Sequence, residues 1–349
     1  MAAATAENGA RHILEIAEGF MKSQVLFTGM KLGIFDLLGT SSAPMTTMGI
    51  AEGIGADTDA TKRLLDACVG LRLLQKVNMD KETGNGEYQL TKASKAFLTS
   101  SSSPNLGDWL GRLAAVYSSP WADLPRAVKE GPNFCTLNGF ERGKTFEDLY
   151  STAQYFMGSM EGLTTVFGAG TASAFNLAEF QNICDIGGCT GPLAYHLAAA
   201  YPEASVSVFD LPEVVKIAED RRPTGEYAQR VSFISGDFFQ DPLPPADLYV
   251  VCRILHDWTE DKVLTLLTKL YDSLPQGGGV LIVEHILTND KLGPEVAHKY
   301  DLHMMVCTGG RQRSGQEFKR LLSSVGFTEV TVKNNTYPFG YVLARKQRV

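Results

Sequence analysis

The side chains best suited to acid–base chemistry lie in one short segment, Arg253-Ile254-Leu255-His256-Asp257-Trp258. His256 follows an apolar run typical of a buried strand, and histidine is the side chain whose pKa lies nearest neutral pH. It could therefore act as a general base that removes a proton from a hydroxyl group as that group attacks. Glu284, at the end of the next apolar run, could orient His256, and Asp257 could position a substrate.

A glycine-rich segment, Asp185-Ile186-Gly187-Gly188-Cys189-Thr190-Gly191, has the composition of a ligand-binding turn. Glycines let the backbone approach a ligand closely, and the N-terminus of a following helix presents free N–H groups to an anion. Asp185 would repel a pyrophosphate but could hold the ammonium of an amino-acid-like ligand. The spacing GGxxG differs from the GxGxxG of dinucleotide binders, which disfavours an NAD-dependent oxidoreductase. The alternative is a tight strand-to-helix turn without a ligand.

Two further acidic positions follow apolar runs that predict strands. Asp210 could accept hydrogen bonds from both hydroxyls of a ribose, as in NAD or S-adenosylmethionine (SAM), or it could instead cap the helix that follows. Asp237, in Gly236-Asp237-Phe238-Phe239, could accept the amino group of adenine while Phe238 covers the face of the ring. The alternative for this segment is a loop with a core phenylalanine.

The elements that must position these residues alternate between strand and helix in the C-terminal half of the chain. Regular alternation predicts a doubly wound, mostly parallel, Rossmann-like sheet of seven strands, in which ligands bind at the carboxyl ends of the strands. Only a short segment separates the last two strands, so they should pair antiparallel. The predicted strands are residues 182–186, 205–209, 231–234, 248–252, 280–283, 329–332 and 340–344.

The N-terminal region has a different pattern. Apolar residues recur at helical spacing over residues 13–38, and a helix–turn–helix pattern followed by a two-stranded hairpin predicts a winged-helix-like domain. Winged helices also occur in DNA-binding regulators, but basic residues are offset by acidic ones here. We expect a winged-helix-like region over 1–103, connector and pocket helices over 104–175, and the α/β domain over 176–349.

Composition narrows the class of protein further. The 349 residues carry a formal net charge of −7, so the chain lacks the basic surface that nucleic acids require. No apolar run reaches the roughly 18 residues that a membrane span needs, and the N-terminus has no signal-peptide pattern. The six cysteines form no CxxC pair and none pairs with histidine at zinc spacing. We therefore expect a cytoplasmic enzyme with reduced thiols and no metal, nucleic-acid or membrane partner.

With these motifs placed, the chain resembles the acetylserotonin O-methyltransferase family, within the wider group of hydroxyl O-methyltransferases. The likeness runs nearly end to end, and together its motifs are highly specific for SAM-dependent O-methylation. It is carried by the segments 19–27, 32–38, 184–188, 208–215, 236–239 and 255–258.

The resemblance implies an N-terminal region that forms an intertwined homodimer, and a SAM site with S-adenosylhomocysteine (SAH) as the product. It implies His256 as the base and Asp257 at the acceptor. Donor contacts implied by the family are Tyr150, Asp210, Gly236, Asp237, Phe238 and Arg253. Phe156, Met157 and Met160 match a stretch that lines the acceptor pocket, although ordinary helix core would also explain them.

The implied reaction is methyl transfer from SAM to the 5-hydroxyl of N-acetylserotonin, which gives melatonin. A phenol ionises with a pKa of roughly 10, so removing its proton makes it a better nucleophile. The sulfonium methyl is already activated, so no metal is needed. Three positions depart from the family pattern: Thr164 replaces a frequent Trp, and His303 and Cys307 stand where acetylserotonin enzymes carry Asn and Gln. These departures leave another phenol or hydroxyindole open as the acceptor.

Overall fold

The computed structural model describes residues 2–115, 121–131, 153–334 and 337–347, which fall into two compact units, Met1–Ala115 and Val116–Val349. The region expected as a separate connector, 104–175, is divided between these units. Helix α7 (Gly107–Ala115) belongs to the first unit, whereas α9 (Leu124–Glu130) and α12 (Ala153–Ala172) belong to the second.

The first unit begins with three helices, α1 (Ala2–Ala17), α2 (Gly19–Lys31) and α3 (Ile34–Thr40). The apolar periodicity over residues 13–38 therefore spans three helices rather than one. The chain turns between α2 and α3 at Gly33, whose φ of 72° is readily adopted by glycine.

The winged-helix prediction is confirmed in the rest of the first unit. Helix α4 (Thr47–Ile54) is capped by the Thr46 hydroxyl and α5 (Thr58–Gly70) by the Asp57 carboxylate, which satisfy backbone donors at each helix start. Strands β2 (Leu74–Val77) and β3 (Glu87–Leu90) form the expected hairpin. A short strand, β1 (Met45–Thr46), adds to β3, so the sheet has three strands where two were expected. Helix α6 (Lys92–Phe97) follows it.

The second unit contains the predicted seven-stranded sheet, and each predicted strand is found. Its order is β6-β5-β4-β7-β8-β10-β9. The first five strands in this order pair in parallel. β10 is antiparallel to β9, as expected from the short segment between them, and it is also antiparallel to β8. The strands are β4 (Asn182–Ile186), β5 (Ser205–Asp210), β6 (Val231–Ser235), β7 (Leu248–Cys252), β8 (Gly279–Glu284), β9 (Thr328–Lys333) and β10 (Gly340–Arg345).

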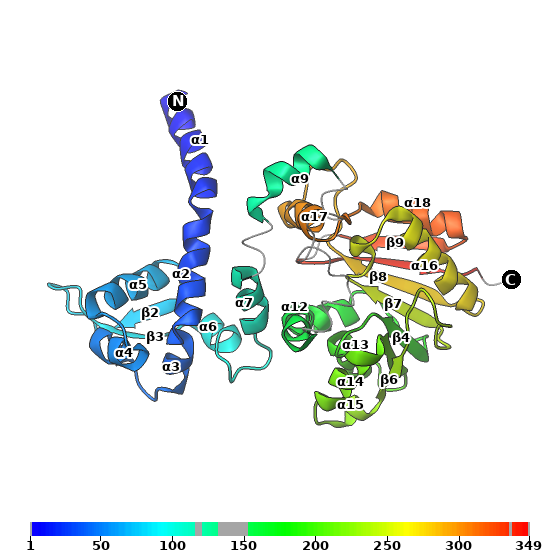
Figure 1. Ribbon diagram of the computed structural model, residues 1–349, viewed down its shortest axis with the longest axis horizontal. Helices are drawn as coiled ribbons and strands as arrows, with labels where there is room; N and C mark the ends of the chain where they lie inside the picture. Colours follow the sequence, from blue (N-terminus) through cyan, green and yellow to red (C-terminus); the bar gives the residue numbers. More distant parts are fainter. Residues whose placement is uncertain (1, 116–120, 132–152, 335–336, 348–349) are drawn as a thin grey trace. The chain divides into compact units, whose positions relative to one another are not determined.

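Helices cover both faces of this sheet (Figure 1). α13 (Pro192–Ala200), α14 (Pro212–Asp220) and the short α15 (Glu226–Gln229) lie on one face, and α16 (Glu260–Ser273) and α18 (Gly315–Val325) lie on the other. α17 (Glu295–Cys307) contacts α9. Because both faces are covered, β8 is buried along its whole length and reads as a continuous apolar run.

The chain order reverses between β4 and β7, which are neighbours in the sheet. In open α/β sheets this reversal opens a crevice at the carboxyl ends of the strands, where ligands bind. The acidic and glycine-rich segments singled out above follow β4, β5, β6 and β7, so the topology brings them to the same edge. Among the helices of the described ranges, none is long and apolar enough to cross a bilayer.

Candidate active site

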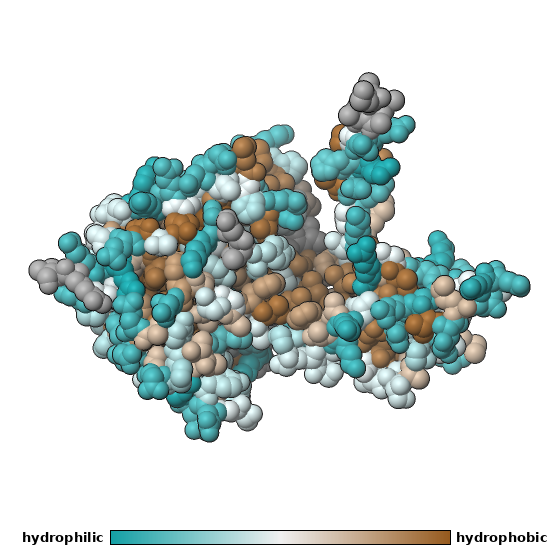
Figure 2. All heavy atoms as spheres, turned by 180° about the vertical axis from the view of Figure 1, so that it is seen from behind, coloured by the Kyte–Doolittle hydropathy of each residue, from teal (hydrophilic) through white to brown (hydrophobic). Residues whose placement is uncertain are grey.

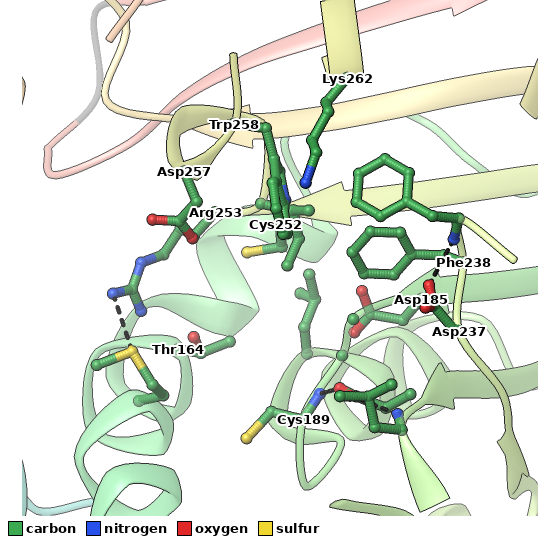
Figure 3. A pocket seen from close by; sticks show the side chains of 18 of the residues that line it. Thr164, Asp185, Cys189, Asp237, Phe238, Cys252, Arg253, Asp257, Trp258 and Lys262 are labelled. Atoms are coloured by element: carbon green, nitrogen blue, oxygen red, sulfur yellow. Dashed lines mark hydrogen bonds between the residues drawn. The ribbon is translucent and has the colours of Figure 1, made fainter. Parts of the chain in front are cut away.

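A cavity of about 520 Å³ opens at this edge of the sheet. Its walls come from the segments that follow β4, β5, β6 and β7, from the start of α16, and from Met160 and Thr164 of α12. Figure 3 shows acidic side chains, aromatic rings and one lysine converging on this space. All of its lining residues belong to the second unit.

In the turn after β4 the backbone itself forms the cavity wall, and there is no room for side chains at its glycines. Gly187 has a φ of 66°, and a Cβ on Gly188 would lie 2.6 Å from a carboxylate oxygen of Asp185. Asp185 is almost fully buried, and its Oδ1 has no hydrogen-bond partner among the described residues. Burial, reinforced by the charge of Asp210, raises the pKa of Asp185 to about 8. A cationic ligand group would therefore be favourable beside it.

Asp210 ties the glycine turn to the segment after β5. One carboxylate oxygen accepts from the backbone N–H of Cys189 and the other from that of Leu211, each at 2.8 Å. Helix α14 has Leu211 as its N-cap residue and no side-chain cap, so Asp210 does not cap this helix. Burial raises the pKa of Asp210 to about 6, although the two hydrogen bonds by themselves lower it. Each oxygen keeps a lone pair that a ribose hydroxyl can meet.

The loop after β6 carries the aromatic wall. Asp237 accepts a 2.7 Å hydrogen bond from the N–H of Phe239, which shapes the loop, and both Asp237 and Phe238 line the cavity. The Phe238 and Phe239 rings pack against Trp258, with Phe239 edge-to-face at 4.9 Å. Gly236 does not line the cavity. A Cβ there would come within 2.5 Å of the Phe209 ring, so close packing favours glycine at this position.

Sequence reasoning missed a cationic element of this wall. The Lys262 ammonium lies 4.4 Å from the Trp258 ring centroid and faces the cavity (Figure 3). No local pattern places it there, because Trp258 has an extended backbone and lies before α16, which begins at Glu260. The functional roles of Phe239 and Trp258 were likewise not assigned from sequence.

On the opposite side of the cavity, Arg253 lies beside α12. It has a φ of 59°, and its Nη2 lies 3.6 Å from the sulfur of Met160. Met160 and Thr164 both line the cavity with Arg253 and Asp257 (Figure 3). The departure at Thr164 therefore falls on the wall of the site.

His256 lies on a single turn of 3-10 helix, Leu255–Asp257, directly after β7. Its Nδ1 is 2.5 Å from Oε2 of Glu284, the last residue of β8, and Oε1 of Glu284 accepts from the His256 backbone N–H at 3.2 Å. Both side chains are buried, and neither lines the cavity, whereas Asp257 does. The Nε2 atom of His256 is directed toward Asp257, 3.6 Å from its Oδ1.

This geometry defines the protonation of the imidazole. A carboxylate only accepts, so Nδ1 carries the proton and Nε2 is left as the basic nitrogen. Burial by itself lowers the pKa of His256, but the charges of Glu284 and Asp257 outweigh it, so the pKa lies above its usual value. A buried imidazole held in this way can take a proton from a hydroxyl group beside Asp257.

The remaining candidates lie elsewhere. Met157 is fully buried in a small cluster with Val214, in keeping with the helix-core alternative. His303 and Cys307 are buried in α17, where His303 stacks on Trp121 and its Nδ1 accepts from the indole N–H at 3.1 Å. Tyr150 lies outside the described residues, as does the side chain of Phe156.

Known proteins share this architecture. Residues 121–328 match the O-methyltransferase domain, and residues 14–100 match the O-methyltransferase dimerisation domain. The acetylserotonin O-methyltransferase of Macaca mulatta is 37% identical over 97% of this chain and 99% of its own length. The chain belongs to the SAM-dependent O-methyltransferase family.

Two further relatives place the chain within this family. The solved structure of human N-acetylserotonin methyltransferase in complex with SAM superposes with a TM-score of 0.89 at 35% identity, covering 97% of this chain and 98% of that one. A probable bifunctional dTTP/UTP pyrophosphatase/methyltransferase of Homo sapiens is 39% identical over 96% of this chain, which spans 53% of that protein. The predictions of fold class, enzyme class and SAM as methyl donor are confirmed.

Proposed function

We propose that this O-methyltransferase transfers the methyl group of SAM to the hydroxyl of a small aromatic acceptor, with N-acetylserotonin as the leading candidate and melatonin as its product. The observation that carries the proposal is the buried His256–Glu284 pair, whose Nε2 atom lies 3.6 Å from Asp257, a residue that lines the cavity together with Asp185 and Asp210. Relatives named for acetylserotonin or N-acetylserotonin, matched over nearly the whole chain, favour this acceptor.

The donor site is assigned to residues around the β4–β7 crevice. When bound, SAM supplies a methyl group that its sulfonium has already activated. Asp185 would accept the ammonium of the methionyl part, which gives its unpartnered Oδ1 a partner. Asp210 would accept the ribose hydroxyls. Asp237 would accept the adenine amino group while Phe238 covers the ring, and Gly187 leaves room for the methionyl chain.

The chain itself moves one proton. His256 Nε2 accepts it from the acceptor hydroxyl, and Glu284 stabilises the charged imidazole that results. Asp257 would hold the acceptor hydroxyl next to Nε2, and Arg253, Met160 and Thr164 would shape the same side of the cavity. The aromatic wall excludes water, which strengthens each of these electrostatic contacts.

His303 and Cys307 differ from the Asn and Gln of acetylserotonin enzymes, and this difference affects which acceptor the site can bind. His303 accepts a hydrogen bond from Trp121, and its Nδ1 atom lies 3.6 Å from the Cys307 sulfur. We assign to them the shape of the acceptor end, with the roles of Phe156 and Met157 resting on the family pattern. Another phenol or hydroxyindole as acceptor is the alternative. Transfer of tritiated methyl from SAM to a panel of hydroxyindoles, catechols and flavonoids decides between them, because N-acetylserotonin should show the highest kcat/KM.

A homodimer forms part of the proposal. The first helix exposes Ile13, Leu14 and Ile16, and α2 exposes Phe20 and Met21, each with more than half of its surface accessible. Figure 2 shows such hydrophobic side chains between hydrophilic ones along this helix. An apolar stripe of this kind is typical of a face that a second copy covers, and it lies at the start of the matched dimerisation domain.

A further inference from the structure

The turn that carries His256 is only one turn long. Its N-cap residue, Ile254, makes no side-chain hydrogen bond to it, whereas Glu284, from β8, accepts from the His256 backbone N–H. Short 3-10 turns have poor hydrogen-bond geometry, so they need support from neighbouring segments. The position of Nε2 therefore depends on contacts made from outside the turn.

A loop from a distant part of the sequence provides that support. Residues 310–313, between α17 and α18, lie directly against the turn. The backbone N–H of Arg311 donates to the carbonyl of His256 at 2.8 Å. A Cβ on Gly310 would lie only 1.8 Å from the same carbonyl oxygen, so only glycine fits there.

The Arg313 guanidinium donates hydrogen bonds to both ends of the turn. Its Nη1 donates to the carbonyl of Leu255 at 2.9 Å, and its Nη2 donates to the carbonyl of Trp258 at 3.4 Å. These two carbonyls flank His256 and Asp257. Arg313 is 2% exposed, and both of its terminal nitrogens donate to backbone carbonyls, while its Nε has no partner among the described residues.

The same residue is also tied to the strand that carries Glu284. The carbonyl of Arg313 accepts from the N–H of Leu287 at 3.1 Å, three residues beyond Glu284. The guanidinium of Arg313 binds the turn that carries His256, while its backbone carbonyl binds Leu287 just beyond β8. Arg313 thereby fixes the turn that bears the base relative to the strand end that bears its carboxylate.

We propose that Arg313 is a positioning residue for the methyl-transfer step, which holds the Leu255–Asp257 turn so that His256 stays aligned with Glu284 and with the acceptor. This inference rests on the proposed role of His256 as the base. Misplacing a catalytic group by about 1 Å can lower a rate by roughly 100-fold, so loss of this grip should act on kcat. The acidic donor groups Asp185, Asp210 and Asp237 lie on β4, at the end of β5 and after β6, so SAM binding should change much less than kcat.

The test compares Arg313→Met, Arg313→Lys and the control Arg230→Met. Arg230 also donates to several backbone carbonyls, those of Tyr201, Pro202 and Ala204 at the end of α13, but it does not line the cavity. We expect Arg313→Met to lower kcat about 10- to 100-fold, with a much smaller change in SAH affinity. The ammonium of Arg313→Lys can reach only one carbonyl at a time, so the kcat of this variant should lie between those of Arg313→Met and wild type. If Arg313→Met does not fold, Arg313→Lys provides the test.

Two results would overturn the inference. One is a folded Arg313→Met or Arg313→Lys variant with wild-type kcat, and the other is an equal loss of kcat in Arg230→Met. His256→Ala is measured beside these variants, because it tests the proposed base independently of Arg313. If His256→Ala alone keeps near-normal turnover, the proposed base is wrong. If it abolishes turnover while Arg313→Met is normal, only the positioning role is wrong.

Discussion

The Nδ1 atom of His256 lies 2.5 Å from Oε2 of Glu284, and both side chains are buried at the carboxyl ends of neighbouring parallel strands. The pair is 28 residues apart in sequence and is brought together by the register of β7 and β8. A buried carboxylate in this position fixes both the tautomer and the charge that the imidazole can carry. The reactivity of Nε2 should therefore depend on Glu284.

We expect Glu284→Gln to lower kcat about 100-fold, because a neutral amide cannot stabilise the imidazolium that forms when His256 takes a proton. His256→Ala should abolish turnover while SAM binding survives. The measurement is kcat with saturating SAM and acceptor. Glu295→Gln, which removes an exposed carboxylate paired with Lys299, is the matched control. A Glu284→Gln variant with wild-type kcat would remove the carboxylate from the mechanism.

The pH profile of kcat tests the electrostatics of the same pair. The base acts when His256 is neutral, so kcat falls as the pH drops through its pKa. The charges of Glu284 and Asp257 raise this pKa in spite of burial, so the midpoint should lie above the usual value of about 6.5. Asp257→Asn removes one of the two charges and should move the midpoint to lower pH. If the midpoint is the same in Asp257→Asn and wild type, His256 is not the group whose pKa sets the profile.

Donor affinity should depend on the charge of Asp210. Its pKa is raised to about 6, so its carboxylate is charged above that pH and becomes protonated below it. We expect SAM binding to weaken as the pH falls through 6, since a protonated carboxyl is a poorer acceptor for ribose hydroxyls. Asp210→Ala should weaken binding about 10-fold or more. Calorimetry checks both, with the exposed Asp220→Ala as control.

Much of the proposed donor site could be predicted because the parallel strands end at one edge of the sheet. The alternation of strands and helices places Asp185, Asp210 and Asp237 at the same crevice. The close approach of the backbone at Gly187 and Gly188 could also be predicted, and the structure shows that this turn leaves no room for side chains.

The rest depends on contacts that no periodicity encodes. The stacking of Trp121 on His303 joins positions 182 residues apart, and the grip of Arg313 on Leu255 joins positions 58 apart. Strand β1 has two residues and no alternating pattern of its own, so its pairing with β3 could not be foreseen. Such features follow from how packed elements meet after folding rather than from local composition.

Trp258 should report on donor binding. The chain has three tryptophans, and Trp258 lines the cavity with Phe239 and Lys262 packed against its ring. Binding of SAH should place a new group against this wall and change the intrinsic fluorescence. Trp258→Phe should remove most of that change, whereas Trp109→Phe, in the first unit, should keep it. A full signal in the Trp258→Phe variant would place the adenine elsewhere.

The exposed apolar stripe of α1 predicts how the chain assembles. Ile13 and Ile16 are each 68% exposed, which is unfavourable unless another surface covers them. The double substitution Ile13→Glu and Ile16→Glu places two charges in that contact and should weaken dimerisation at least 10-fold, about 1.4 kcal/mol. Light scattering across a dilution series measures the change. Met48→Glu, an equally exposed apolar position on α4 of the same unit, is the matched control. A wild-type chain that stays monomeric at high concentration would disprove the homodimer, and a double variant as dimeric as wild type would move its interface away from α1.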